Sequence, residues 1–145
     1  MSTKRIALGI TVMVAAVFLM ARPSQGHHAF IAEFDPSKPV RVQGTIARVA
    51  WTNPHTWFFV DAKGADGKVQ HWAFEGGGPY ALIRRGFTKD YLKPGTKVVV
   101  EGFMARGVPY RASAQSIKYP DGRVLFVGTF GVGAPPVGAK NPPAK

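Results

Sequence analysis

The sequence predicts a mainly β fold: a small OB-like β-barrel of five to six strands, with one short helix between strands 3 and 4. Three observations lead to this prediction. Three strand-like runs come before residue 76, one short helix signal follows them, and two or three further strand-like runs end near residue 128. This order of elements is that of the OB-fold. An open β-sandwich with the helix packed on one end is the alternative.

The first predicted strand, residues 40–51, alternates apolar and polar side chains in "VRVQGTIARVAW". Alternation with period two is typical of a half-buried strand. Gly44 interrupts the pattern, and a lone glycine in a strand usually marks a bend or bulge. A long bent strand is what a small barrel needs to contribute to both of its halves.

A hairpin is predicted next. The turn "TNPH" at residues 52–55 leads into "TWFFVDA" at 56–62, and the third strand is "VQHWAFE" at 69–75. Asn and Pro supply the turn chemistry of the first connection. Asp66-Gly67, which lies between the two apolar runs, is a typical hairpin signal.

A short helix over residues 79–85 is predicted from Pro79 in its first turn and Gly86 at its end. The remaining strands are expected at residues 96–103 and 110–119, with a further one at 122–128. The side chains expected to fill the barrel are Val42, Ile46, Phe58, Val60, Trp72, Phe74, Val98 and Val100.

The chain divides into three parts. Residues 1–26 have the pattern of a cleavable signal peptide, with a positive start at Lys4 and Arg5 and an uncharged apolar run over residues 6–21. Ser24 and Gly26 fit cleavage after Gly26. Residues 27–127 form the barrel domain, with an N-terminal arm at 27–39 that has aromatic residues but no sustained periodicity. Residues 128–145 form a Gly/Pro/Ala-rich tail expected to be disordered. The predicted location is therefore periplasmic or secreted; an uncleaved membrane anchor is the alternative.

The formal charge of +11 falls to +8 when the predicted leader, with its three basic residues and no acid, is removed. Outside the cytoplasm this charge points to anionic lipid head groups, acidic glycans or an acidic protein rather than to nucleic acid. The membrane is expected to matter only for the uncleaved leader, and no particular protein partner is indicated. With no cysteine in the chain, disulfides and thiolate metal sites are excluded.

Several motifs together resemble a family of small secreted bacterial proteins of unknown function. They are "HHAF", "GTIARVAWTNPHTWFFVD", "WAFEGG", "LKPGTKVVVEG" and the closing "DGR", between about residues 27 and 127. The shared feature is an Asn-Pro-His motif after the first strand. The resemblance implies a compact β domain outside the cytoplasm, and it implies no activity or ligand.

The four histidines suggest a metal site. Cleavage after Gly26 would give His27 a free amine, which with its Nδ1 and a third nitrogen from His55 would form a copper-binding "histidine brace". His28 offers a competing planar mode through the amine, a backbone amide and its imidazole, and His71 is a further candidate ligand. Zinc is the second choice, since three histidines and a water also suit it.

A metal-free binding face is the alternative. Trp57, Phe59 and His71 are expected on the outer face of strands 2 and 3. This face is flanked by Lys63, Lys68 and the Arg84-Arg85 pair, and it would bind an anionic glycan, a lipid head group or a protein. A packing role for the two aromatic side chains fits the same pattern.

No catalytic residue is predicted. The carboxylates are scattered, no serine lies in a nucleophile elbow, and "GGGPY" lacks the Lys-Ser/Thr of a P-loop. Glu75 beside three glycines is a base near backbone N–H groups or, more simply, part of a turn. The sequence therefore predicts a non-enzymatic protein and leaves a copper-dependent oxidase open.

Overall fold

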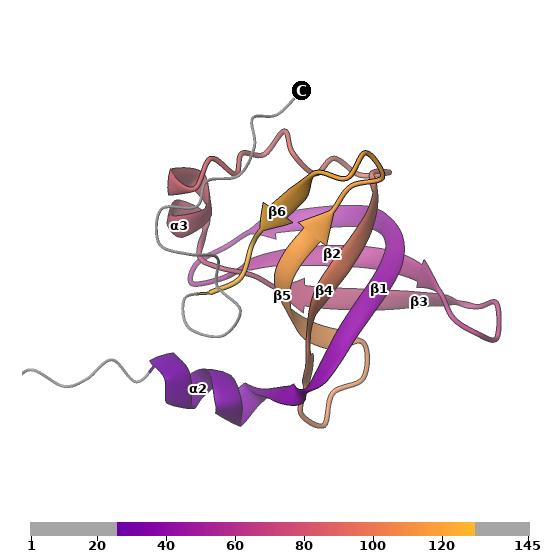
Figure 1. The fold of residues 1–145 in the computed structure, drawn as a ribbon, viewed down its shortest axis with the longest axis horizontal. Helices are drawn as coiled ribbons and strands as arrows, with labels where there is room; N and C mark the ends of the chain where they lie inside the picture. The colour runs from indigo at the N-terminus through magenta and orange to yellow at the C-terminus, as the bar shows by residue number, and fades with distance from the viewer. Residues whose placement is uncertain (1–25, 130–145) are drawn as a thin grey trace, which may run out of the picture.

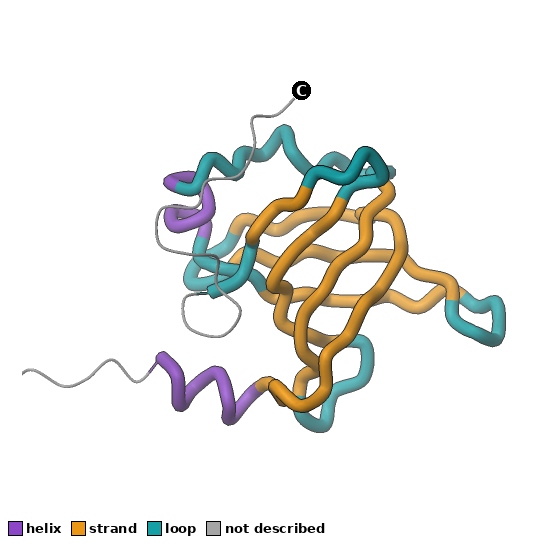
Figure 2. Tube along the Cα trace, viewed as in Figure 1, coloured by secondary structure: helices purple, strands orange, loops and turns teal. Residues whose placement is uncertain are grey.

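A computed structural model describes residues 26–129 of the chain (Figures 1 and 2). This part consists of one six-stranded sheet and two short helices. The elements are α2 (Gly26–Glu33), β1 (Phe34–Trp51), β2 (Thr56–Lys63), β3 (Val69–Glu75), α3 (Pro79–Arg84), β4 (Lys97–Ala105), β5 (Arg111–Lys118) and β6 (Val124–Phe126).

The sheet curls into a barrel-like ring (Figure 1). Its strand order is β3-β2-β1-β4-β5-β6, and an additional parallel pairing between β3 and β5 joins the two sides. Five strands therefore follow one another around the ring as β1-β2-β3-β5-β4, with α3 between β3 and β4 in the chain. The predicted mainly β, OB-like fold class is confirmed.

The long β1 pairs with both β2 and β4, which lets one strand serve both halves of the ring. The register shift in its pairing with β2 falls between Ile46 and Arg48, two residues beyond the glycine expected to mark it. Gly44 has another role: a Cβ there would lie 2.4 Å from the carbonyl oxygen of Asp61. The close approach of β2 to β1 at this point requires a residue without a side chain.

The core fills the ring as predicted, with one exception. Seven of the eight expected core side chains are buried; Trp72 is only partly buried and packs against the core, with its ring stacked on Phe74. A fully buried Val, Ile, Leu or Phe side chain stabilises a fold by about 1.5–3 kcal/mol. The largest fully buried side chains are Phe58, Phe74, Phe87, Ile46, Leu82, Ile117 and Leu125.

The predicted helix is α3, which begins at Pro79 and is followed by Gly86 at φ 82°. Proline suits the first turn of a helix, and glycine adopts the left-handed conformation that ends one. The side chains of Leu82 and Phe87 are buried in the core. As a result, α3 and the residues after it cover one end of the ring (Figure 2).

The predicted N-terminal arm at residues 27–39 has regular secondary structure. Its first part is α2, and its second part is the start of β1, which begins at Phe34. Between Phe34 and Pro39 the pairing of β1 with β4 is shifted, so the segment with its two prolines crosses this stretch without a regular ladder. Proline lacks the N–H that a central ladder needs, which is why the sequence pattern gives no strand here.

Arg106 ties the junction of α2 and β1 to the end of β4. Its backbone N–H donates to the carbonyl oxygen of Glu33 at 2.9 Å, and its side chain donates to Ile31 at 2.9 Å and to Asp35 at 3.2 Å. The hydroxyl of Ser37 also donates to Asp35 at 2.6 Å. These contacts fix where α2 leaves the ring.

The Asp35→Asn variant is expected to lose less free energy of unfolding than the unaltered protein when the pH falls from 6 to 3. The hydrogen bond from Ser37 is the main cause that lowers the pKa of Asp35, with Arg106 and Lys38 adding to it against the opposing effect of burial. A lowered native pKa stabilises the fold above the unfolded pKa of about 3.9, and this stability is lost as the pH falls through the native value. Urea unfolding at pH 6 and pH 3 checks this; an equal difference between the two proteins at both pH values would contradict it.

The predicted signal peptide and most of the predicted tail lie outside the described residues. Val127, the last residue of the predicted barrel domain, and Gly128, the first of the predicted tail, donate their N–H groups to the carbonyl oxygen of Gln115 at 3.0 and 3.3 Å. Neither helix of the described part is long and apolar enough to span a bilayer.

Candidate functional site

Two loops meet at one end of the β2–β3 hairpin: "TNPH" before β2 and "GGG" after β3. The N–H of Thr56 donates to Gly77 at 3.1 Å, and the N–H of Gly76 donates to Thr56 at 2.8 Å. A Cβ on Gly78 would lie 2.8 Å from the carbonyl oxygen of Pro54, so the glycine run allows the loops to touch. The N–H groups of Gly76 and Gly77 are bonded to carbonyls, so the sequence-based suggestion that they serve as free donors is not supported.

This loop contact places His55 against Glu75, the last residue of β3. His55 Nδ1 contacts Glu75 Oε1, and the carboxylate is buried, with 6 % of its side chain exposed. The imidazole is 38 % exposed. Since Nδ1 faces the buried carboxylate, Nε2 is the ring nitrogen left for another partner. A carboxylate that holds one imidazole nitrogen fixes the tautomer and the orientation of the ring.

Arg111, the first residue of β5, joins this pair to the end of α2. Its Nη2 donates to Glu75 Oε2 at 3.0 Å and also contacts Glu33 Oε1. Its guanidinium carbon lies 5.1 Å from the centre of the Trp57 ring and 5.8 Å from that of Phe34. We call His55, Glu75, Arg111 and Glu33 the His55 network.

Hydrogen-bonding capacity remains beside the His55 network. Arg111 Nε and Ser113 Oγ are buried and have no hydrogen-bond partner among the described residues. Ser113 is the register partner of Glu75 on β5. Buried polar atoms without a protein partner are rare and are frequently satisfied by a group outside the chain.

His71 belongs to a separate contact. Its Nδ1 lies 2.7 Å from Asp61 Oδ1, and both side chains are exposed. His71 and Glu75 are four residues apart on β3, which corresponds to roughly 13 Å along a strand. The structure therefore does not bring His71 together with His55.

The other two candidate ligands, His27 and His28, lie in α2, and their side chains are outside what the structure describes. Among the described side chains, no group of three His, Asp or Glu residues is close enough to hold a metal ion. His55 is thus the one predicted ligand whose surroundings are defined in detail.

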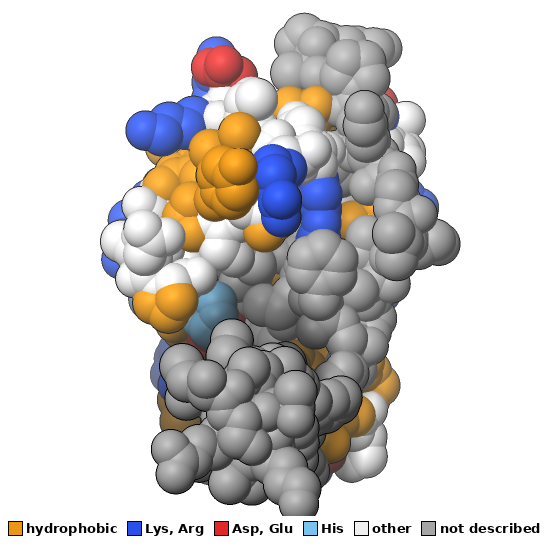
Figure 3. Space-filling model, turned by 90° about the vertical axis from the view of Figure 1, so that its left-hand side faces the viewer, with side chains coloured by type: hydrophobic (Ala, Val, Ile, Leu, Met, Phe, Trp, Pro, Cys, Tyr) orange, Lys and Arg blue, Asp and Glu red, His pale blue; other side chains and the backbone are white. Residues whose placement is uncertain are grey.

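The aromatic side chains of the predicted binding face are covered by arginines. Trp57 lies under Arg111, and the guanidinium carbon of Arg48 is 3.5 Å from the centre of the Phe59 ring. Arg84 and Arg85 are on or just after α3, where Arg84 stacks on Tyr80 at 4.9 Å and Arg85 donates to Gly128 at 2.9 Å. Figure 3 shows hydrophobic side chains beside Lys and Arg side chains on the side of the molecule where α3 lies.

One protein family matches the part of the chain that carries this site. A model described as "Family of unknown function (DUF6152)" matches residues 15–111, about two thirds of the chain. The chain belongs to the DUF6152 family. This confirms the predicted family of unknown function. No curated protein and no solved structure matches the chain.

The DUF6152 match spans all four histidines and every residue of the His55 network. Sequence reasoning named His55 but missed Glu75 as its partner, and it missed Arg111 and Glu33 entirely. A signal for Glu75 was present: the Asp66-Gly67 hairpin pairs it with Trp57, two residues from His55. No comparable signal in the DUF6152 sequence points to Arg111 or Glu33, which are 36 and 42 residues from Glu75.

Proposed function

We propose that this protein is an exported, non-enzymatic copper-binding protein in which Nε2 of His55 is a metal ligand. The observation that carries the proposal is the contact between His55 Nδ1 and the buried carboxylate of Glu75. Metal-binding histidines usually donate their second ring nitrogen to a carboxylate or carbonyl, which orients the ring and makes it more basic. The His55 network supplies that carboxylate.

The charge of the network also supports a cationic ligand. Two carboxylates, Glu33 and Glu75, surround one guanidinium, that of Arg111. With a neutral imidazole the network has one negative charge in excess, so a metal ion at Nε2 is attracted rather than repelled. Both carboxylate oxygens of Glu75 already have a partner: Oε1 contacts His55 and Oε2 contacts Arg111. The metal ligand is therefore the imidazole of His55, not the carboxylate.

His27 is the proposed partner ligand, through its α-amine and imidazole after cleavage following Gly26. The contact of Glu33 with Arg111 places the last residue of α2 at the network. His27 is six residues before Glu33 in the same helix, a rise of about 9 Å. His28 offers the competing planar mode. A set of amine and imidazole nitrogens favours Cu(II), with zinc as the second choice.

The test uses mature protein that begins at His27, confirmed by N-terminal sequencing of exported material. We expect one Cu(II) per chain, and a loss of affinity of at least about tenfold in His27→Ala and in His55→Ala. His71→Ala is the matched control, since His71 is an exposed imidazole paired with a carboxylate elsewhere on the hairpin. Equal affinities of the His55→Ala variant and the unaltered protein would overturn the proposal.

A second candidate is a metal-free module for an anionic glycan, a lipid head group or a protein partner. The formal charge of +11 in the full chain favours it. Because Arg111 and Arg48 cover the aromatic side chains of β2, the expected platform of Trp57 and Phe59 is better explained as packing. Chelator treatment separates the candidates: it should lower the thermal stability of copper-loaded protein, whereas a metal-free module would be unaffected.

A further inference from the structure

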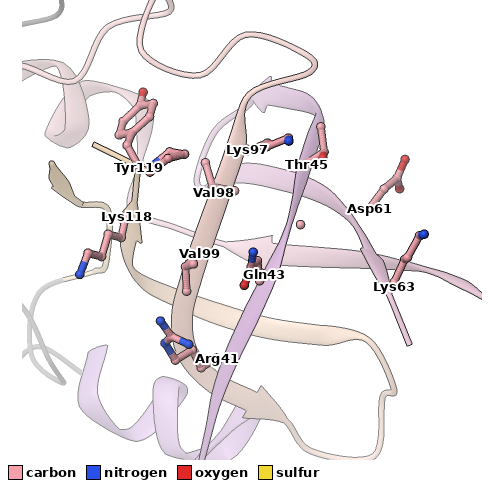
Figure 4. Close-up of a pocket in the computed structure, with 12 residues that line it drawn as sticks. Arg41, Gln43, Thr45, Asp61, Lys63, Lys97, Val98, Val99, Lys118 and Tyr119 are labelled. Atoms are coloured by element: carbon pink, nitrogen blue, oxygen red, sulfur yellow. The ribbon is translucent and has the colours of Figure 1, made fainter. Parts of the chain in front are cut away.

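A groove of about 790 Å³ crosses the outer face of the ring, on strands β2, β1, β4 and β5 (Figure 4). It is separate from the His55 network, and no residue of that network lines it. Its charged lining residues are Arg41, Asp61, Lys63, Lys97 and Lys118.

The strand register explains why these side chains share one face. Gln43 pairs with Val99, and Val99 pairs with Lys118, so the three residues lie in a row across β1, β4 and β5. The pairing of Thr45 with Asp61 continues this row toward Lys63 on β2. Figure 4 shows Lys118 and Lys63 on opposite sides of the groove, with Gln43 and Val99 between them. Three strand spacings separate the two lysines, a backbone distance of up to about 14 Å.

The cationic side chains of the groove outnumber its one carboxylate, that of Asp61. Lys63, Lys97 and Lys118 form no ion pair with the described residues, whereas Arg41 pairs with Glu101 at 3.2 Å and Asp61 pairs with His71 at 2.7 Å. Three unpaired ammonium groups around one concave surface attract an anionic ligand and raise its local concentration.

We propose that this groove binds a linear anionic glycan, a polysaccharide that carries carboxylate or sulfate groups. The ammonium groups would contact the anions, and Gln43 and Thr45 offer an amide and a hydroxyl that can both donate to and accept from sugar hydroxyls.

Other anionic partners fit the groove less well. Single-stranded nucleic acid usually needs aromatic stacking platforms. The one aromatic lining residue, Tyr119, is buried, and its hydroxyl is bonded to the carbonyl of Tyr91. A flat bilayer would meet the concave floor poorly, and none of the exposed large hydrophobic side chains of the described part lines the groove. The centre of a protein interface is normally depleted of charged residues, whereas five charged side chains line this groove.

The test compares two triple variants of the full mature protein with the same loss of charge. One is Lys63→Gln, Lys97→Gln, Lys118→Gln in the groove; the other is Lys38→Gln, Lys89→Gln, Lys93→Gln, at exposed positions outside it. The probes are a size-defined heparin oligosaccharide and polygalacturonate, titrated at two salt concentrations by fluorescence anisotropy or calorimetry. We expect the groove variant to bind roughly tenfold more weakly or worse, with a reduced salt dependence, and the control variant to change less than about twofold.

Three outcomes would overturn the proposal. Equal losses in both variants would show that only net charge matters. Absence of glycan binding by the unaltered protein, or tighter binding to single-stranded DNA or to vesicles with 30 % phosphatidylglycerol, would exclude the glycan as the occupant. Circular dichroism verifies that the groove variant is folded. Neither the variants nor the probes involve copper, so this test and that of the proposed function fail independently.

Discussion

Replacing Gly102 with alanine is expected to abolish the native fold or to lower the free energy of unfolding by more than about 4 kcal/mol. A Cβ at this position would lie 1.6 Å from the carbonyl oxygen of Ser113 and 2.8 Å from its carbonyl carbon. Both are backbone atoms of the adjacent strand, so no side-chain rotation relieves the overlap. Gly102 follows the irregularity in the β4–β5 ladder, and the strands must separate to accommodate a methyl group.

Urea unfolding followed by circular dichroism measures this effect. The control is Gly77→Ala, whose new Cβ would lie 3.3 Å or more from its neighbours and therefore needs only small adjustments. We expect the control to lose no more than about 1–2 kcal/mol. A Gly102→Ala protein as stable as Gly77→Ala would show that β4 and β5 do not approach each other as closely as described.

The Glu75→Gln variant is expected to weaken Cu(II) binding by about 10–100-fold while keeping the size of the side chain. The amide presents no negative charge to His55 Nδ1, so the imidazole is less firmly oriented. Arg111 keeps only Glu33 as a charged partner. Because Arg111 is partly buried, we also expect a loss of stability of about 1–3 kcal/mol.

The matched control for Glu75→Gln is Asp61→Asn. Asp61 contacts His71 through the same ring nitrogen, but both side chains are exposed and outside the His55 network. Competition titrations of Cu(II) against a chelator of known affinity, made on both variants at one pH, separate the two positions. Equal losses of affinity in Asp61→Asn and Glu75→Gln would rule out a specific role of Glu75.

The strands of the ring could be predicted because local patterns fix them. Burial alternates along β2, and a hairpin turn at Asp66-Gly67, where Gly67 has φ 77°, joins it to β3. Burial in β1 alternates from Val40 to Ile46, and of the eight core side chains expected only Trp72 is no more than partly buried. The sequence did not predict several other core side chains after residue 80, among them Leu82, Phe87 and Ile117. Trp72 is less buried because it lies near the edge of the core, beside the exposed Tyr110.

Helix α2 could not be predicted from its sequence. "GHHAFIAE" has no acidic residue in its first turn and no basic residue in its last. Two contacts that hold it are with residues distant in sequence: Phe30 packs on Phe103, and Glu33 contacts Arg111. Tertiary contacts of this kind override weak local preferences.

The candidate site could be predicted only in part for the same reason. His55 was recognisable from its place in a rigid turn, but its orientation depends on Glu75, 20 residues later, and on Arg111, 36 residues beyond that. Only the parallel pairing of β3 with β5 brings Arg111 to this point, where Arg111 is the register partner of Ala73. No periodicity in a single sequence encodes that pairing.

Electron paramagnetic resonance of the copper-loaded mature protein tests the central claim most directly, because it reports which nitrogens bind the metal. We expect Cu(II) to show hyperfine coupling to several nitrogens in the unaltered protein and to lose one imidazole nitrogen in His55→Ala. Identical spectra of the two proteins, with His71→Ala as the reference, would contradict a role of His55 as ligand.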